Sequence, residues 1–173
     1  MQTYIRESAE AGAAVHEVEQ EPWKRVLQLG HESLNLFFNL QGNGDVGATL
    51  TLEDGATLNR LETPRPLEYQ SIFGRFDLER VIYGSRETQK IEYVPLDNRL
   101  QLPESKFSYV LQAWDQSMVV EMPYRAVNQP LSKILGFTQS SDSLERMNRH
   151  MSQTVPEFQQ RQPQPPLATS AQM

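Results

Sequence analysis

Apolar residues recur with helical spacing near the start of the chain. Between residues 22 and 41 this spacing is kept by Trp23, Val26, Leu27, Leu34, Phe37 and Phe38. Pro22 suits the first turn of a helix, and Gly42 is typical of a residue that ends one. The pattern therefore predicts an amphipathic helix that packs on an apolar surface. Residues 1–20 have helix-forming composition with a weaker apolar stripe, which predicts a marginal, exposed helix.

From residue 48 the apolar period changes to two, which is typical of strands. The segment "ATLTLEDGATLNRLE" alternates around Asp54-Gly55, and "LEYQSIFGRFDLERVIYG" alternates around Gly74. Asp-Gly between alternating segments is a strong hairpin signal. The segment "QKIEYVPL" adds one short strand that Pro95 ends. Residues 48–102 are thus predicted to form antiparallel hairpins or a small meander.

Helical spacing returns after Pro103. A helix of about four turns is predicted by the positions of Phe107, Val110, Leu111, Trp114, Met118 and Val119. Pro123 should end this helix. The segment "NQPLSKILG" then predicts a short second helix, with Pro130 in its first turn and Gly136 at its close.

A third helix is predicted in "DSLERMNRHMSQ", residues 142–153. Its apolar face carries Leu144, Met147 and Met151, and Asp142 and Glu145 have the spacing of a capping box. Two helices joined through a glycine turn to a capped third helix are the arrangement of a helix-turn-helix, whose last helix enters the DNA major groove. The outward face then offers hydroxyls to phosphates and guanidinium groups to guanine, through the candidate DNA-binding residues Ser140, Ser141, Ser143, Arg146 and Arg149. A solvated face on a plain helical subdomain is the alternative that this pattern leaves open.

These segments together predict an α+β chain with four regions. An N-terminal region of amphipathic helices spans 1–47, and the antiparallel hairpins span 48–102. A three-helix, helix-turn-helix-like bundle spans 103–155. Residues 156–173 are rich in Pro and Gln with few large apolar side chains, which predicts a disordered linker or tail.

Composition narrows the chemistry that the chain can perform. Cysteine is absent, and the three histidines, His16, His31 and His150, are too scattered for a metal site, so neither metal nor cofactor is expected. The acidic pairs Glu53-Asp54 and Asp77/Glu79 lie in turn or strand positions typical of solvated carboxylates, and no catalytic set is predicted. No apolar run approaches the roughly 18 residues that a membrane helix needs, which predicts a cytoplasmic chain without a membrane partner.

The formal net charge of -6 argues against a strongly basic nucleic-acid-binding protein. The acidic excess is concentrated before residue 22, however, while residues 125–149 are close to balanced. A local DNA-binding surface in the third helix therefore remains compatible with the charge.

Three long segments carry a family resemblance. They are "GHESLNLFFNLQGNGDVG", "SIFGRFDLERVIYGSRETQKIEYVPLDNRLQLPESKFSYVLQAWDQ" and "ILGFTQSSDSLERMNRHM". Across residues 22–166 the chain closely resembles the N-terminal region of insertion-sequence transposases of the Kra-four type. The segment "VVEMPYRAVNQPLSKILG" departs from that family, and its Pro123 and Pro130 leave the length of the middle helix open.

The resemblance implies a part in DNA transposition, with recognition of the terminal inverted repeats at the ends of the element. In the family, a ribonuclease-H-like core with three acidic residues and two metal ions follows the Pro-rich linker. No acidic residue follows Glu157 here, so no catalytic residue carries over. We therefore expect a chain truncated before the catalytic core and inactive on its own.

The resemblance also suggests partners. The first is DNA carrying the terminal inverted repeats. The second is another protein chain, either a further copy in a homo-oligomer or full-length transposase in a hetero-oligomer. The alternative function is a regulatory or protein-interaction remnant that pairs with intact transposase without binding DNA itself.

Overall fold

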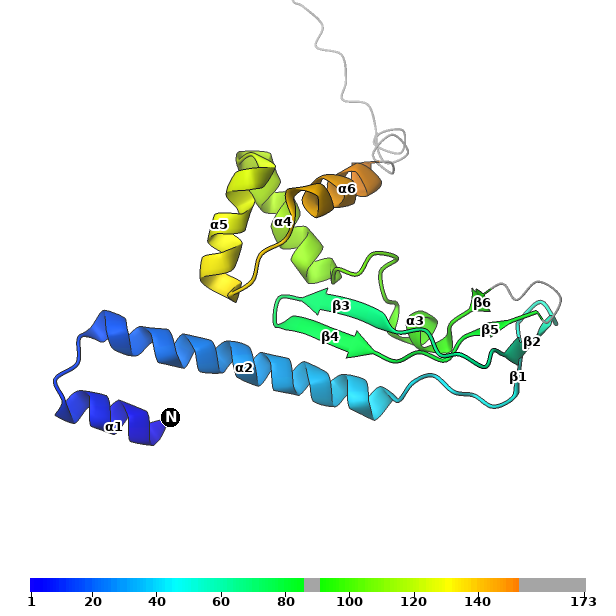
Figure 1. Ribbon diagram of the computed structural model, residues 1–173, viewed down its shortest axis with the longest axis horizontal. Coiled ribbons are helices and arrows are strands. Elements are labelled where there is room, and N and C mark those ends of the chain that lie inside the picture. Colours follow the sequence, from blue (N-terminus) through cyan, green and yellow to red (C-terminus); the bar gives the residue numbers. More distant parts are fainter. Residues whose placement is uncertain (86–90, 153–173) are drawn as a thin grey trace, which may run out of the picture.

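The computed structural model describes residues 1–85 and 91–152 (Figure 1). In chain order its elements are α1 (Gln2–Glu10), α2 (Val15–Gln41), β1 (Thr49–Thr51), β2 (Thr57–Arg60), β3 (Leu67–Ser71), β4 (Gly74–Leu78), β5 (Tyr83–Gly84), β6 (Ile91–Tyr93), α3 (Pro95–Leu100), α4 (Tyr109–Glu121), α5 (Tyr124–Leu135) and α6 (Ser141–Ser152). Helices combined with small antiparallel sheets confirm the α+β class. The tail predicted for 156–173 lies outside the described residues. No helix in the described ranges is both long and apolar enough to cross a membrane.

Helix α2 begins earlier than its apolar pattern predicted. It starts at Val15, and Pro22 lies inside it rather than in its first turn, so the predicted start was wrong. A proline inside a helix removes one backbone hydrogen bond. The helix-forming residues before Pro22 still extend the helix back to Val15. The break from α1 comes instead at Gly12, whose φ of +66° lies in the left-handed region that glycine adopts without strain.

The strands form two sheets, so of the two predicted alternatives, antiparallel hairpins or a small meander, the structure contains the hairpins. Both predicted hairpins are present: β1 pairs with β2 around Asp54-Gly55, and β3 pairs with β4 around a turn at residues 72–73, with Gly74 as the first residue of β4. Strand β2 then pairs with β5, which gives a sheet of order β1-β2-β5-β6, and β3-β4 stands apart. The two sheets bury different apolar clusters, since Phe76 in β4 packs with Phe38 of α2 while Tyr83 in β5 packs with Leu58.

Helix α3 lies within residues 48–102, where only hairpins were predicted. Pro95 does follow the last strand, as expected, but it also fills the first turn of this short helix. Leu96 is buried, and an ion pair joins Asp97 to Arg80. These long-range contacts stabilise a six-residue helix that local sequence alone does not specify.

Helix α2 docks on the turn of the β3-β4 hairpin through an unusually close approach. Gly30 faces Phe73 so closely that an added Cβ atom would overlap the phenyl ring. Beside it, His31 Nδ1 lies 3.0 Å from the carbonyl oxygen of Phe73, and the imidazole stacks on Phe76 with ring centroids 4.5 Å apart. The absence of a side chain at residue 30 thus allows the hairpin turn to sit directly on α2.

Helices α4, α5 and α6 enclose the largest apolar cluster. Its buried members are Phe107, Leu111, Val127, Leu131, Leu135, Leu144 and Met147. Helix α5 starts at Tyr124, and Pro130 is interior to it, so the prediction that Pro130 lies in the first turn was wrong. Burial of Val127, Leu131 and Leu135 at four-residue intervals explains why the helix continues across the proline.

Two sets of hydrogen bonds connect these helices to the rest of the chain. Gln70 in β3 donates its backbone N–H to the carbonyl of Lys106 and accepts from the N–H of Ser108, both at 2.8 Å. On the other side, the Trp23 indole Nε1 donates to the carbonyl oxygen of Ile134 at 2.8 Å. The β3-β4 hairpin therefore lies between α2 and the C-terminal helices (Figure 1).

The contact between Gly30 and Phe73 gives a test of this docking. In an unconstrained helix, Gly30→Ala would stabilise the protein by about 1 kcal/mol through helix propensity. Here we expect destabilisation by about 1–3 kcal/mol, because the new methyl group forces the ring of Phe73 away. Denaturant unfolding of the wild type and of Gly30→Ala would measure this difference in the free energy of unfolding.

A double-variant cycle supplies the control. In a Phe73→Ala background the ring is gone, so Gly30→Ala should become stabilising. A Gly30→Ala variant that stabilises the wild-type protein as much as the Phe73→Ala protein would contradict the close packing.

Candidate nucleic-acid interface

Ser140 caps the N-terminus of α6, so the predicted opening at Asp142 was wrong. Its hydroxyl accepts from the backbone N–H of Ser143 at 3.1 Å and also donates to the Ser143 hydroxyl at 2.8 Å. Asp142 instead lies in the first helical turn, where its charge favours the positive end of the helix dipole. The prediction placed the capping residue two positions too far along the chain, because Ser140, Ser141 and Asp142 are all residue types that favour the N-terminal cap of a helix.

The two arginines of the predicted site have different surroundings. Arg149 forms an ion pair with Glu145 one turn earlier on α6, with 2.6 Å between the guanidinium nitrogen and the carboxylate oxygen. Arg146 is exposed and has no ion pair within residues 1–85 and 91–152. Glu145, predicted to reach back to the capping residue, therefore offsets the charge of Arg149 instead. Arg146 is the guanidinium that is more available to an external anion.

Arg146 borders a shallow pocket of about 410 Å³ between α6 and the loop that leads into α4. The pocket is lined by Glu104, Ser105, Lys106, Phe107, Gln112, Ser143, Arg146, Met147 and His150. Lys106 is held by Glu68 at 2.8 Å, and His150 Nε2 lies 3.8 Å from a carboxylate oxygen of Glu104. Basic groups from two segments therefore surround Arg146, although sequence reasoning selected α6 alone.

A buried polar group fixes where α6 begins. Gln139, just before the cap, is almost fully buried. Its backbone N–H donates to Asn128 Oδ1 on α5 at 2.9 Å, and its side-chain Nε2 donates to Asp115 Oδ2 on α4 at 2.8 Å. Sequence reasoning missed these three residues, because no local pattern shows that they meet. Their hydrogen bonds tie the start of α6 to both neighbouring helices.

The buried carboxylate in this group carries an electrostatic cost. Burial raises the pKa of Asp115 from its ordinary value to about 6, and the hydrogen bond from Gln139 opposes the shift only in part. The other carboxylate oxygen of Asp115 and the amide oxygen of Gln139 have no hydrogen-bond partner in the part of the chain that the structure describes. A proton on Asp115 removes the buried charge and adds a donor to a group that has too many acceptors.

The structure brings Ser141, Ser143, Arg146 and Arg149 together on the first three turns of α6, with Ser140 as the capping residue before them. This arrangement can bind an anion through hydroxyls and one available guanidinium group. Within the described ranges, no group of three or more His, Asp or Glu residues could hold a metal ion. No protein-family model, curated protein or solved structure matches the chain.

The raised pKa of Asp115 predicts how stability changes with pH. Because the folded protein binds this proton more tightly than the unfolded chain, the contribution is favourable at pH 4 and is lost as pH rises through about 6. Asp115→Asn should remove that dependence, which we expect to reach about 3 kcal/mol at most.

Chemical denaturation of the wild type and of Asp115→Asn at pH 4, 5, 6 and 7 would measure this difference. Asp54→Asn, at an exposed turn, is the matched control and should keep the wild-type profile. A gap between Asp115→Asn and the wild type that stays constant with pH would contradict titration of Asp115.

Proposed function

We propose that the chain binds duplex DNA through α6, as the N-terminal recognition part of an insertion-sequence transposase. Its target would be the terminal inverted repeats of the element, and its location the cytoplasm. The observation that carries the proposal is the exposed face of α6, where Arg146 has no ion pair with any described residue while Leu144 and Met147 on the opposite face are buried. A helix held in this way presents its polar face without loosening the core.

The surroundings of α6 support a helix-turn-helix interpretation. Helix α5 ends at Leu135 and is capped by Gly136, whose φ of +76° is typical of this position, and residues 136–140 lead into α6. This link is slightly longer than the three to four residues of the usual motif. Gln139 is held by hydrogen bonds to both α4 and α5, which fixes the longer link.

The charge distribution on α6 predicts unequal roles for the arginines. Arg146 is available to a phosphate or a guanine edge, whereas Arg149 must first leave Glu145. The same carboxylate repels DNA phosphates. We therefore assign the principal contact to Arg146 and treat Glu145 as a group that weakens binding.

Binding to terminal-repeat and scrambled duplexes at two salt concentrations tests the proposal. Arg146→Ala should weaken binding by about 1–3 kcal/mol and Arg149→Ala by less. Glu145→Gln should strengthen binding, because it removes a negative charge and releases Arg149. If Arg146 reads a base, its loss should also reduce the preference for the terminal repeat.

Arg6→Ala is the matched control, since it removes one exposed arginine from α1, far from α6 (Figure 1). Circular dichroism would show that each variant is folded. Undiminished binding by a folded Arg146→Ala/Arg149→Ala protein, or equal losses with Arg6→Ala, would assign any DNA contact to another surface.

A further inference from the structure

Helix α2 carries a second apolar face that is largely exposed within residues 1–85 and 91–152, with α1 beside only its N-terminal half. Its members, here called the α2 stripe, are Val15, Pro22, Val26, Leu29, Leu36 and Leu40. Leu29 is 64% exposed and Leu40 is 76% exposed, although both are large apolar side chains. The face toward the hairpin is different, because it uses Gly30, His31 and Phe38. Exposed apolar residues gathered on one helix face mark an interaction surface.

The spacing of the stripe fits another helix. From Val26 onward, positions 26, 29, 33, 36 and 40 are separated alternately by three and four residues, and only Ser33 among them is polar. The alternation continues backward through Pro22 and position 19 to Val15. An apolar seam with this spacing packs against a helix that has the same repeat.

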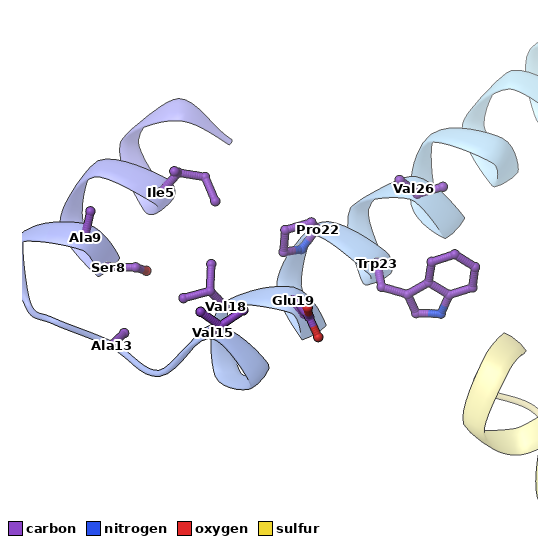
Figure 2. A pocket seen from close by; sticks show the side chains of 10 residues that line it. All are labelled: Ile5, Ser8, Ala9, Ala13, Val15, Val18, Glu19, Pro22, Trp23 and Val26. Carbon is purple, nitrogen blue, oxygen red and sulfur yellow. The ribbon is translucent and has the colours of Figure 1, made fainter.

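The N-terminal half of the stripe also forms one wall of an apolar groove. Helix α1 lies on the side of α2 away from the hairpin (Figure 1). Between α1 and α2 is an open groove of about 480 Å³, lined by Ile5, Ser8, Ala9, Ala13, Val15, Val18, Glu19, Pro22, Trp23 and Val26. In Figure 2, Ile5 of α1 and Val18 and Pro22 of α2 point toward the space between the two helices. The C-terminal half of the stripe, in contrast, projects as a ridge made by Leu36 and Leu40.

We propose that a second copy of this chain covers the α2 stripe, with the two α2 helices antiparallel. A two-fold axis near the middle of the stripe places the Leu36 and Leu40 ridge of each copy in the groove of the other. In this register Val26 faces Leu29 of the partner copy, and Val15 faces Leu40. The groove and the ridge lie on one surface, so the interface is self-complementary and closes at two copies.

Charged residues beside the seam favour the antiparallel arrangement. Arg25 and Glu32 lie on the same flank of the stripe. Arg25 comes before the centre of the stripe, which is between residues 27 and 28, and Glu32 comes after it. The antiparallel register brings Arg25 of one copy opposite Glu32 of the other, twice per dimer. A parallel register would place Glu19 against Glu19, inside the seam, where like charges repel. Within a single copy, Arg25 pairs with Glu21 of its own helix, at 2.8 Å on an exposed surface.

The first test is the molecular mass of the full chain in solution, measured by sedimentation equilibrium. One copy has a mass of 19.9 kDa, and we expect twice that mass. Leu36→Glu/Leu40→Glu should convert the protein to single copies with an unchanged circular dichroism spectrum, since both side chains are already exposed. Val120→Glu is the matched control, because Val120 is an equally exposed apolar residue on α4, and it should remain a dimer.

Exchange of the flanking charges tests the orientation. Arg25→Glu alone and Glu32→Arg alone should each shift the equilibrium toward single copies at least tenfold, because each places like charges opposite one another. The double variant Arg25→Glu/Glu32→Arg restores opposite charges and should dimerise like the wild type.

Each remaining outcome overturns the proposal. A wild-type chain that sediments as one copy excludes the dimer, and so does an assembly of three or more copies. Dimerisation that survives Leu36→Glu/Leu40→Glu assigns the interface to another surface. A double charge variant that fails to recover dimerisation excludes the antiparallel register.

Discussion

The contact between Gly30 and the turn of the β3-β4 hairpin sets the relative positions of the other elements. Because residue 30 has no side chain, the ring of Phe73 reaches the backbone of α2, and His31 then contacts both Phe73 and Phe76. The opposite side of the hairpin is bound to residues 106–108, which lead directly into α4. A two-stranded hairpin is only marginally stable alone. Here it gains stability from helices on both sides, and it transmits the position of α2 to the C-terminal helices.

A buried carboxylate has a different part in the same architecture. Asp115 is fully buried and raises the cost of folding above pH 6, because its charge lies beside an apolar cluster with one good hydrogen bond. Replacement by a well-packed apolar residue would leave Gln139 without its partner. The polar contact is directional, whereas the surrounding leucines would pack in several arrangements. Asp115 and Asn128 therefore specify the path of the chain into α6 rather than its stability.

The sequence predicted the features that depend on neighbouring residues. Asp54-Gly55 specifies its hairpin locally, and the apolar spacing identified α2 near the N-terminus and the helices that follow Pro103. Features that depend on distant residues were missed. Pro22 and Pro130 are strong local signals for a helix start. They are outweighed by the helix-forming residues that precede Pro22 within α2 and by tertiary burial on α5. The candidate site was located by its serines and arginines. The pairing of Arg149 with Glu145 was not predicted, since Glu145 also fits a capping box.

The two proposed surfaces are separated by the hairpin, so they do not compete. The stripe residues are exposed and differ from those of α2 that contact β3-β4, while α6 lies beyond the opposite side of the hairpin from α2 (Figure 1). A net charge of -6 on each copy opposes both association and DNA binding. The apolar stripe favours association through a term that does not depend on charge, and salt would strengthen it by screening the repulsion. DNA binding through Arg146 has the reverse salt dependence, because it releases counterions from the duplex. Ionic strength therefore distinguishes the two interactions within one protein.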